Sequence, residues 1–482
     1  MNIMDIVILA VLGVSVIFGM YRGFISGVLS VAALIGAAAA AFAVIAVLSV
    51  TLLVSAAVSK RDGRILATVL PIGVAAVSGM VGYVVAWLLS DVFVVFGVGL
   101  GSRVMSWVAA GFAIAGFAIV HIVLSRGMMR VAAAILTVFA ILAAAIGIDQ
   151  SYGEYATIGS LFGEDSYSQA DLTGLAKRKD LITVAQWRKQ AANGTIRNIP
   201  ANGTVNKIDI PATKSQFEAR KALVYLPPAA LADSKRKPAL PVVLMLSGQP
   251  GSPGRVFQAG GIQTMMDGYA KTHDGLAPIV IAADQLGADS HNTLCVDSKV
   301  YGNALTYLTQ DVVDWVKTNL PAAQDAKDWA IAGFSQGATC SLQIGVNHPD
   351  LFGTMIPTDS EIKPTNGSRQ EMIDRFFDGD TTAYENQVPV NAIRNHAPTH
   401  QMLIIGAGEK DTTSIRNVKT IAPVAAKAGM RVAAVESSGN AHDWHAVQDV
   451  LRYGLAVFGH DTGLDGANPN LSDYPNLKRI TI

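Results

Sequence analysis

The first 150 residues of this chain are so apolar that they restrict it to the folds available in a lipid bilayer. Only eleven charged side chains occur in this stretch, and long apolar runs separate them. A helix needs about 20 mainly apolar residues to cross the hydrocarbon core of a membrane. We therefore predict a transmembrane helical domain over residues 1–149 with about five spans, near residues 4–20, 27–56, 66–90, 104–125 and 130–148.

The lysines and arginines between these runs predict an orientation. The loop at residues 60–64 carries three of them, and Arg126 and Arg130 flank another loop. With five spans these two loops share one side, which the positive-inside rule assigns to the cytoplasm. The N-terminus is then cytoplasmic, and everything after Asp149 is extracytoplasmic in a multi-pass protein of the cell membrane. Because the charged residues lie at span ends, we expect the spans to anchor the protein rather than to transport a solute.

The remainder of the chain has the pattern of a domain with alternating strands and helices. A polar linker covers residues 150–202, short apolar runs and helix-like segments fill residues 203–460, and a polar tail covers residues 461–482. This alternation predicts an α/β domain with a mostly parallel sheet, in which chemistry gathers at the carboxyl ends of the strands. Lys+Arg and Asp+Glu both number 37, so the net charge is zero and no nucleic-acid partner is indicated.

The motif that indicates chemistry is Gly-Phe-Ser-Gln-Gly at residues 333–337. It lies between the apolar run Trp329–Ala332 and the helix-like segment Ala338–Val346. That order of strand, sharp turn and helix is the context of a G-x-S-x-G nucleophile elbow. Side chains at the two glycines would collide with the neighbouring strand or helix, and the turn holds the Ser335 hydroxyl clear of the sheet. The alternative is an ordinary glycine-rich turn between a strand and a helix.

A serine nucleophile needs a base and an orienting acid, and in this fold they follow it in the order acid, then histidine. Asp411 lies in the loop after a predicted strand, and His442 follows the last predicted strand in a Gly/Asn turn. We assign Ser335 as the nucleophile, His442 as the general base and then acid, and Asp411 as the orienting acid. Glu409 and His445 are the alternative acid and base. For each of these acidic residues and histidines, the alternative is that it is a surface-loop residue without a catalytic role.

The tetrahedral intermediate of such a reaction also needs hydrogen-bond donors for its oxyanion. The backbone N–H of Gln336, directly after the nucleophile, is one candidate. The loop after the strand predicted at Pro241–Leu246 supplies the other, and we choose Gln249 because Pro250 has no N–H. A simple Gly/Pro turn is the alternative for this loop.

The two cysteines lie near the predicted active-site edge of the sheet. Cys295 is in the loop region after a predicted strand, and Cys340 is just inside the helix that follows the nucleophile. We predict a disulfide that ties this loop down, with two buried free thiols as the alternative. No group of histidine, cysteine and carboxylate residues has metal-ligand spacing, so we expect neither a metal nor another cofactor.

From about Gly203 to Phe458 the chain resembles the putative-esterase family of α/β-hydrolases, which includes feruloyl esterases, S-formylglutathione hydrolases and mycolyltransferases. Ser247 stands where that family usually has a histidine before glycine, and Asn440-Ala441 stand where it often has Gly-Gly. The pieces that carry the resemblance are VYLPP at 224–228, VLMLSG at 243–248, VDS at 296–298, GFSQG at 333–337, HPDLFG at 348–353, GEKD at 408–411 and HDW at 442–444.

The membrane half lies outside this resemblance. Together with it, the chain is similar to membrane-bound bacterial hydrolases of envelope lipids, including those that remove amino acids from aminoacyl-phosphatidylglycerol. The resemblance implies a serine ester hydrolase, and a membrane anchor favours an ester that is itself held in the bilayer.

We therefore expect cleavage of an acyl or aminoacyl ester of an envelope lipid, with a membrane lipid or lipid-linked ester as the substrate. An acyltransferase of the mycolyltransferase type and a non-catalytic membrane scaffold are the alternatives. If the acyl group is an amino acid, its ammonium needs a nearby anion. Asp297, Asp359 and Glu361 are the candidates, with solvated loop acids or turn caps as the alternative.

Overall fold

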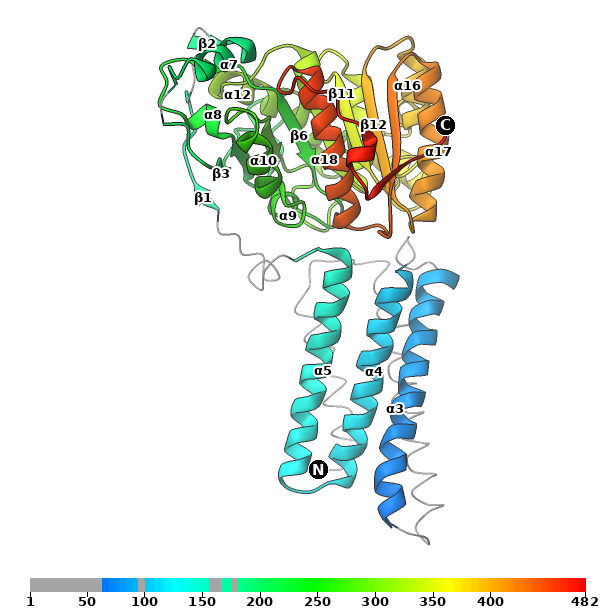
Figure 1. Cartoon of the computed structure of the whole chain (residues 1–482). Coiled ribbons are helices and arrows are strands. Elements are labelled where there is room, and N and C mark those ends of the chain that lie inside the picture. The colour runs from blue at the N-terminus through cyan, green and yellow to red at the C-terminus, as the bar shows by residue number, and fades with distance from the viewer. Residues whose placement is uncertain (1–62, 94–99, 156–166, 176–179, 197) are drawn as a thin grey trace. The chain divides into compact units, whose positions relative to one another are not determined.

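The computed structural model describes residues 63–93, 100–155, 167–175, 180–196 and 198–482, and it separates the chain into two units, Met1–Tyr152 and Gly153–Ile482 (Figure 1). The spans predicted at residues 4–20 and 27–56 lie outside the described residues. The described part of the first unit is helical, and the second unit is built around a large sheet.

Three apolar helices make up the described part of the first unit. They are α3 (Gly63–Trp87), which continues into a π-helical turn at Leu88–Val92, α4 (Gly101–Leu124) and α5 (Met128–Tyr152). The stretches Val69–Val92, Gly101–Leu124 and Met128–Tyr152 have mean hydropathies of 2.0, 2.2 and 2.7 and are long enough to cross a membrane. They coincide with the spans predicted at residues 66–90, 104–125 and 130–148.

Small residues let α4 approach both α3 and α5 closely. A Cβ atom at Gly79 of α3 would lie 3.1 Å from the Cβ of Ala113 in α4. Likewise, a Cβ atom at Gly111 of α4 would lie 2.9 Å from the Cβ of Ala144 in α5. Lipid gives apolar helices no hydrophobic reason to associate, so close packing of this kind stabilises helix pairs in a bilayer.

The second unit contains a ten-stranded sheet in the order β1-β3-β4-β7-β6-β10-β11-β12-β13-β14. Neighbours from β7 to β13 along this order are parallel, as are β1 and β3, whereas β4 is antiparallel to both of its neighbours and β14 to β13. The predicted α/β fold with a mostly parallel sheet is therefore confirmed. The strand bounds are β1 (Ser168–Gln169), β3 (Thr204–Ile208), β4 (Ala222–Leu226), β6 (Val242–Leu246), β7 (Ile279–Ala282), β10 (Trp329–Phe334), β11 (Thr354–Thr358), β12 (Met402–Gly408), β13 (Arg431–Ser437) and β14 (Leu477–Arg479).

Helices connect these strands and cover both faces of the sheet. Two further strand pairs lie outside it, β2 (Leu181–Ile182) with β5 (Lys237–Pro238), and β8 (Asp297–Ser298) with β9 (Gly302–Asn303). The helices are α7 (Val184–Ala192), α8 (Pro228–Leu231), α9 (Pro253–Ala259), α10 (Ile262–Lys271), α11 (Ala304–Thr306), α12 (Val312–Asn319), α13 (Gln336–Asn347), α14 (Arg369–Phe376), α15 (Thr381–Glu385), α16 (Pro389–Asn395), α17 (Thr412–Lys427) and α18 (Trp444–Asp461).

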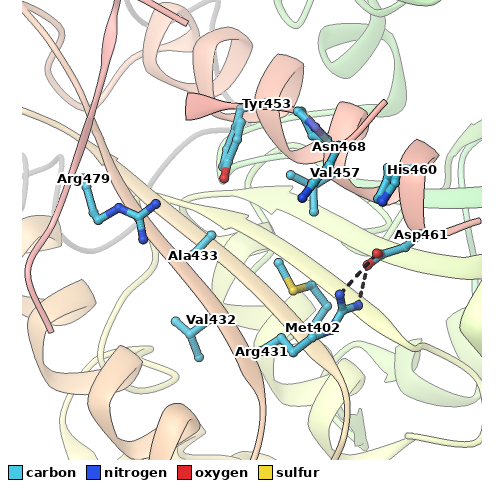
Figure 2. Close-up of a pocket in the computed structure, with 11 residues that line it drawn as sticks. Met402, Arg431, Val432, Ala433, Tyr453, Val457, His460, Asp461, Asn468 and Arg479 are labelled. Carbon is cyan, nitrogen blue, oxygen red and sulfur yellow. Dashed lines mark hydrogen bonds and ion pairs between the residues drawn. The ribbon is translucent and has the colours of Figure 1, made fainter. Parts of the chain in front are cut away.

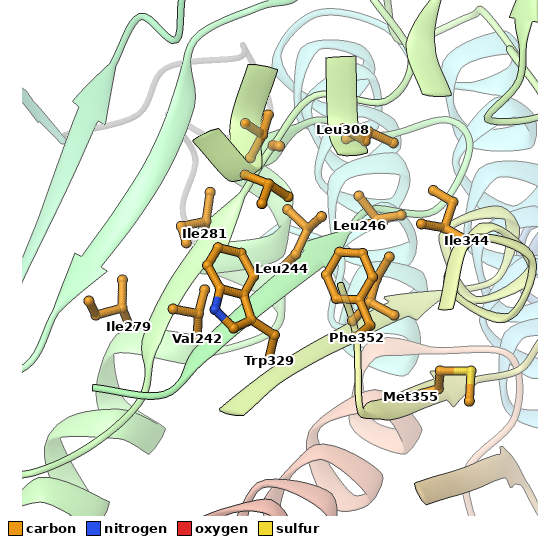
Figure 3. Packing of buried hydrophobic residues seen from close by; sticks show 14 of the residues in the cluster. Val242, Leu244, Leu246, Ile279, Ile281, Leu308, Trp329, Ile344, Phe352 and Met355 are labelled. Carbon is orange, nitrogen blue, oxygen red and sulfur yellow. The ribbon is translucent and has the colours of Figure 1, made fainter. Parts of the chain in front are cut away.

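The sheet is buried on both faces. Alternate residues of β6 belong to two different hydrophobic cores, as the two-residue period of a strand requires. Figure 3 shows one core, in which the rings of Trp329 and Phe352 meet edge to face with centroids 6.3 Å apart. A sheet packed in this way is a firm support for the loops at its carboxyl edge.

Two short strands come from segments that the sequence predicted to be linker and tail. Residues 168–169 of β1 pair with residues 206–207 of β3, and β14 pairs with β13. Strands of two or three residues depend on backbone pairing and show no alternation of apolar and polar residues for sequence analysis to detect. The sheet therefore extends beyond residues 203–460.

Candidate active site

Ser335 occupies a sharp turn between β10 and α13. Its backbone has φ 55° and ψ −116°, and its N–H donates to the carbonyl of Thr358 in β11 at 3.0 Å. A Cβ atom at Gly333 would lie 2.2 Å from the carbonyl oxygen of Gly337, and one at Gly337 would lie 2.3 Å from that of Ser247. The close approach predicted at both glycines is confirmed. The strained turn presents the Ser335 hydroxyl at the N-terminal end of α13.

His442 bridges Ser335 and Asp411. Its Nε2 lies 2.8 Å from Ser335 Oγ, and its Nδ1 lies 2.7 Å from Asp411 Oδ2. Asp411 caps α17, where its Oδ1 accepts the backbone N–H groups of Thr413 and Ser414 at 3.1 and 3.0 Å. The structure thus brings together three side chains that the sequence analysis selected, from the carboxyl ends of β10, β12 and β13.

Burial and hydrogen bonding have opposite effects on these two titratable groups. Burial acts to raise the pKa of Asp411, but hydrogen bonds from His442 and Ser414 outweigh it and lower the pKa. Burial acts to lower the pKa of His442, but the hydrogen bond to Asp411 and the charges of nearby carboxylates outweigh it and raise the pKa. An ionised Asp411 favours the tautomer with the proton on Nδ1, which leaves Nε2 able to accept a proton from serine.

Glu409 and His445, the alternative acid and base, do not form the hydrogen bonds that link Ser335, His442 and Asp411. Glu409 accepts the N–H of Gly439 at 2.7 Å and pairs with Lys478 at 2.9 Å. His445 is exposed on the first turn of α18. The hydrogen bonds that join Ser335 to an imidazole, and that imidazole to a carboxylate, come from the first choices instead.

The loop Ser247–Gly251, chosen as a source of oxyanion donors, lies against Ser335. A Cβ atom at Gly248 would lie 3.6 Å from the Cβ of Ser335. The peptide bond between Gln249 and Pro250 is cis. Gln336 follows the nucleophile as the first residue of α13. The loop and the start of this helix therefore lie side by side at the Ser335 hydroxyl.

Gln285, which the sequence analysis did not select, links these two segments. Its fully buried side-chain amide donates to the carbonyl oxygen of Ser247 at 2.7 Å and to Oε1 of Gln336 at 3.2 Å. The Gln336 amide donates in turn to Asn292 Oδ1 at 3.3 Å. A single polar residue after a strand forms no recognisable motif, so only the fold reveals its position.

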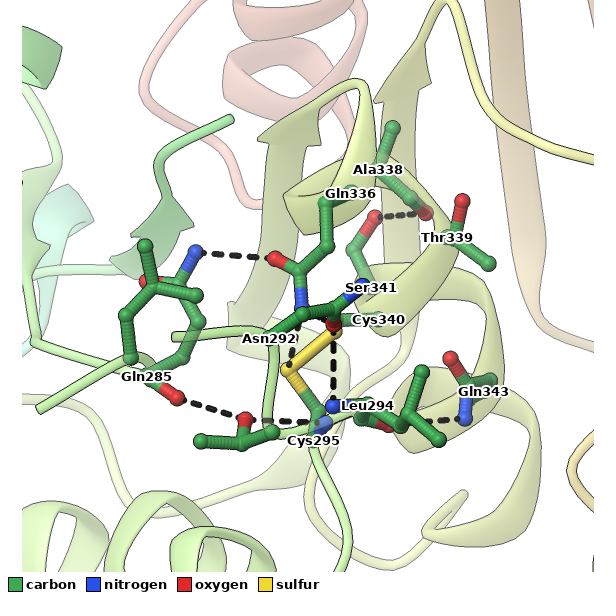
Figure 4. The surroundings of a disulfide bond; sticks show 12 residues. Gln285, Asn292, Leu294, Cys295, Gln336, Ala338, Thr339, Cys340, Ser341 and Gln343 are labelled. Atoms are coloured by element: carbon green, nitrogen blue, oxygen red, sulfur yellow. Dashed lines mark hydrogen bonds between the residues drawn. A yellow bond between two sulfur atoms is a disulfide. The ribbon is translucent and has the colours of Figure 1, made fainter. Parts of the chain in front are cut away.

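A disulfide joins Cys295 to Cys340 beside this network (Figure 4). The two residues are 45 positions apart in sequence, and their Cα atoms lie 5.7 Å apart. Cys340 belongs to α13. In the loop that carries Cys295, the Thr293 hydroxyl donates to the backbone carbonyl of Gln285 at 2.7 Å. The bond therefore ties the loop after β7 to α13, the helix that follows Ser335.

The three acidic candidates for substrate binding differ in their surroundings. Asp297 is exposed in β8, where its carboxylate accepts the N–H and the hydroxyl of Thr306 at 2.9 and 2.6 Å. Asp359 is fully buried and Glu361 is partly buried. Burial raises the pKa of Asp359 to about 8 and that of Glu361 to about 7, while the charge of His442 acts to lower both. Asp359 and Glu361 thus lie close enough to His442 to interact with it, whereas Asp297 serves as a turn cap.

Aromatic packing supports the His442 ring. The ring centroid of Phe334 lies 4.9 Å from that of His442 and 5.0 Å from that of Trp444. The Trp444 Nε1–H donates to Glu154 Oε2 at 2.9 Å, and Glu154 also pairs with Arg255. Residues at the very start of the second unit therefore support the turn that carries the histidine.

Two comparisons of the sequence with known proteins identify the family. The model of the Putative esterase family matches residues 214–454. A protein of Corynebacterium glutamicum, itself described as uncharacterized, is 32% identical over 333 residues, which make up 67% of this chain and 74% of that protein. The chain belongs to the putative-esterase family.

Solved structures resemble the esterase domain in fold alone. An S-formylglutathione hydrolase from Agrobacterium tumefaciens has a TM-score of 0.45 and 15% identity, covering 55% of this chain and 98% of its own. A ferulic acid esterase from Anaeromyces mucronatus has a TM-score of 0.41 and 18% identity, with coverages of 54% and 91%. MPT51 of Mycobacterium tuberculosis has a TM-score of 0.38 and 14% identity, with coverages of 53% and 98%. Likeness at this level carries no information on the substrate.

Within the described part of the esterase domain, one group of side chains has the spacing of a metal site. A ligand atom from each of Asp359, Asp411 and His442 lies within 4.8 Å of the others. Both ring nitrogens of His442 are already hydrogen-bonded, to Asp411 and to Ser335. Hydrogen bonding therefore accounts for the positions of Asp411 and His442, and an ion ligated by His442 would displace one of those bonds.

A pocket of about 290 Å³ lies at the opposite edge of the esterase sheet (Figure 2). Its lining includes Met402 and Arg431, the first residues of β12 and β13, and Tyr453 and His460 of α18. Arg431 pairs with Asp461 across it. Because parallel strands carry their chemistry at their carboxyl ends, this pocket is not the candidate active site.

Proposed function

We propose that this chain is a membrane-anchored, extracytoplasmic serine esterase that cleaves an acyl or aminoacyl ester of an envelope lipid. The observation that carries the proposal is the hydrogen-bonded series from Ser335 through His442 to Asp411, with separations of 2.8 and 2.7 Å. A hydroxyl, an imidazole and a carboxylate in this order form the arrangement that activates serine for attack on a carbonyl.

The reaction proceeds through an acyl-enzyme. His442 Nε2 takes the proton of Ser335 as the oxygen attacks the ester carbonyl, and Asp411 stabilises the resulting imidazolium. The N–H groups of Gln336 and Gln249 stabilise the oxyanion of the tetrahedral intermediate. His442 then gives its proton to the departing alcohol, and the acyl group remains on serine. A water molecule, deprotonated by His442, attacks the acyl-enzyme and breaks the bond to Ser335. The acid leaves, and His442 returns its proton to Ser335 Oγ.

The apolar helices of the first unit favour the hypothesis that the substrate is held in the bilayer. Tethering confines the esterase domain to the membrane surface and raises its effective concentration toward esters on the same surface, whereas a soluble ester gains nothing from it. The apolar helices α3, α4 and α5 serve as three of five proposed spans. Five spans with a cytoplasmic N-terminus put the domain on the outer side, where a disulfide is stable.

An amino acid as the acyl group places an ammonium next to the reacting carbonyl. Glu361 is the best-placed partner, because it is partly exposed and its pKa of about 7 lets an approaching cation shift it to the charged form. Asp359 has no exposed surface, so a substrate group reaches Glu361 rather than Asp359.

Labelling with a serine-reactive fluorophosphonate tests the nucleophile. We expect the probe to modify Ser335 of the wild-type protein and to leave the Ser335→Ala variant unlabelled. Ser341 lies in α13, the helix that follows Ser335, and its buried hydroxyl donates to the carbonyl of Ala338 at 2.8 Å. The matched control Ser341→Ala should therefore be labelled like the wild type. Equal labelling of Ser335→Ala and the wild type would refute the enzyme assignment.

Two extensions of the experiment test the side and the reaction. A probe that cannot cross membranes should label Ser335 in intact cells, and labelling only after lysis would overturn the proposed orientation. Incubation with lipid vesicles that contain aminoacyl-phosphatidylglycerol should release free amino acid. Transfer of the acyl group to another lipid or sugar instead would make the protein an acyltransferase.

A further inference from the structure

Asp359 lies between the turn that carries Ser335 and the loop that carries Asp411. It directly follows β11, which pairs with β10 on one side and β12 on the other. Its N–H donates to the carbonyl of Gly406 in β12 at 2.9 Å, and its backbone is left-handed with φ 54°. A non-glycine residue in that conformation is strained, so the backbone here is held in place by its neighbours.

The carboxyl group of Asp359 is fully buried and only half satisfied. Its Oδ1 accepts the N–H of Gly408 at 2.9 Å. Its Oδ2 has no hydrogen-bond partner among the residues that the structure describes. An oxygen of Asp359, an oxygen of Asp411 and a ring nitrogen of His442 all lie within 4.8 Å of one another. His442 therefore has two buried carboxyl groups beside it.

Two buried carboxyl groups so close together do not both ionise at neutral pH. Asp411 is the one that ionises, because it accepts hydrogen bonds from His442, Thr413 and Ser414. Asp359 accepts a single N–H and keeps its proton, and burial raises its pKa to about 8. The titratable groups that act on Asp359 are His442, Asp411 and Asp443.

We propose that Asp359 is a second positioning acid for His442, one that is protonated while Asp411 is present and orients the imidazole when Asp411 is lost. The proposal rests on the proposed function, since it assigns Asp359 a part in the same proton transfer. Losing the Asp411 charge removes one of the causes that keep Asp359 neutral, while burial still acts to raise its pKa. Asp359 in this variant therefore ionises as the pH is raised toward 8, and it then stabilises the imidazolium.

Variants of the full-length protein in detergent, assayed with a soluble ester such as p-nitrophenyl acetate, test the proposal. Removing the acid of an isolated triad costs about 10⁴-fold in rate. With Asp359 as a substitute, we expect Asp411→Asn to cost no more than about 10²-fold. The double variant Asp359→Asn/Asp411→Asn should lose the remaining activity, down to about 10⁴-fold below the wild type. Asparagine keeps the size and one acceptor of each side chain, so the fold should tolerate the exchanges.

The variant Asp411→Asn/Glu409→Gln is the matched control, because Glu409 was the alternative acid and is hydrogen-bonded to Gly439 instead. It should behave like Asp411→Asn. The residual activity of Asp411→Asn should also increase more steeply toward pH 8 than that of Asp359→Asn/Asp411→Asn, because the base His442 titrates in both variants and Asp359 titrates in the first alone. A merely structural role for Asp359 would lower activity equally at every pH.

The result that would overturn the inference is equal activity of Asp411→Asn and Asp359→Asn/Asp411→Asn at every pH. Thermal unfolding of both variants shows whether either has lost its fold. If the double variant does not fold, the activity of Asp411→Asn at pH 8 still decides, since a loss of about 10⁴-fold in the folded single variant refutes a substitute acid. The proposed function fails separately, when wild-type Ser335 is not labelled by the fluorophosphonate.

Discussion

The two edges of the central sheet differ in how they hold charge. At the carboxyl edge, Ser335, Asp359, Asp411 and His442 are drawn from neighbouring strands, and Asp359 and Asp411 are buried. At the amino edge, Arg431 and Asp461 form an ion pair beside an open pocket, and the Arg431 side chain is 61% exposed. Both edges belong to the same strands, so strand identity does not explain the contrast.

The direction of the parallel strands explains it. At the carboxyl edge β10 turns sharply through Ser335 into α13, β11 ends just before Asp359, and both residues adopt left-handed backbone. Backbone groups and helix N-termini at this edge stabilise buried carboxylates, as at Asp411. Arg431 at the amino edge remains largely in water, where a charge pair contributes little. A change at the carboxyl edge should therefore have a larger effect than a change at the amino edge.

The largest difference should come from the two neighbouring histidines of the carboxyl edge. His442→Ala removes the proposed base, which is hydrogen-bonded to Ser335, and we expect the rate of ester cleavage to fall by about a millionfold. His445→Ala, on the exposed turn three residues later, should change it less than about tenfold. Turnover of a soluble ester by the two purified variants measures this. If His445→Ala loses as much activity as His442→Ala, the assignment of His442 as the single base is wrong.

The second prediction concerns the disulfide. It closes a loop of 45 residues, and loop-closure entropy gives it a contribution of up to about 4 kcal/mol. We expect the double variant Cys295→Ala/Cys340→Ala to lose about 2–4 kcal/mol of unfolding free energy, measured by urea denaturation in detergent. Reductant should destabilise the wild type and leave the variant unchanged. Two free thiols in the mass spectrum of the untreated protein would contradict the bond.

The third prediction follows from the pKa of Asp359, which is about 8 in the folded protein against an ordinary value of 3.8. Between these values the unfolded chain has released a proton that the folded protein retains, so the unfolding free energy falls as the pH rises. Asp359→Asn removes this dependence. Relative to the wild type, the variant should gain about 4 kcal/mol at most between pH 5 and pH 8. Urea denaturation at both pH values measures the gain, and a constant difference between the two proteins would show that Asp359 is ionised when folded.

The smallest effect should come from the amino edge. Arg431→Ala removes a largely exposed ion pair with Asp461, and exposed pairs contribute less than about 1 kcal/mol. We expect a change of that size in unfolding free energy and unaltered ester turnover. A large loss of activity in this variant would mean that the two edges are coupled through the strands.

Much of the fold could be predicted, because buried parallel strands leave a strong sequence signal. The run Trp329–Ala332 lies within β10, the predicted strand Pro241–Leu246 contains β6, and the glycine pattern marks the turn after β10. Chain order and strand ends also singled out His442 and Asp411 among several loop residues. These signals are local, or they follow from the direction of the strands.

The features that could not be predicted depend on distant contacts. The Gln285 amide donates to Ser247 and Gln336, which are far from it in sequence. No residue spacing in the sequence predicts an amide in that position. Asp359 could be selected as an acidic loop residue, but its complete burial depends on β10 and β12 closing around it. Strands β1 and β14 are too short to have a pattern.

The hydrogen bond between Trp444 and Glu154 determines where a soluble form of this domain has to start. A fragment cut at residue 203, where the apolar runs begin, would lose the acceptor of a tryptophan that is only 2% exposed, together with the edge strand β1. Its indole N–H would be left without an acceptor, next to the Phe334 ring that also packs against His442. A protein chemist who begins the fragment at Gly153 keeps that tryptophan anchored, and with it the imidazole.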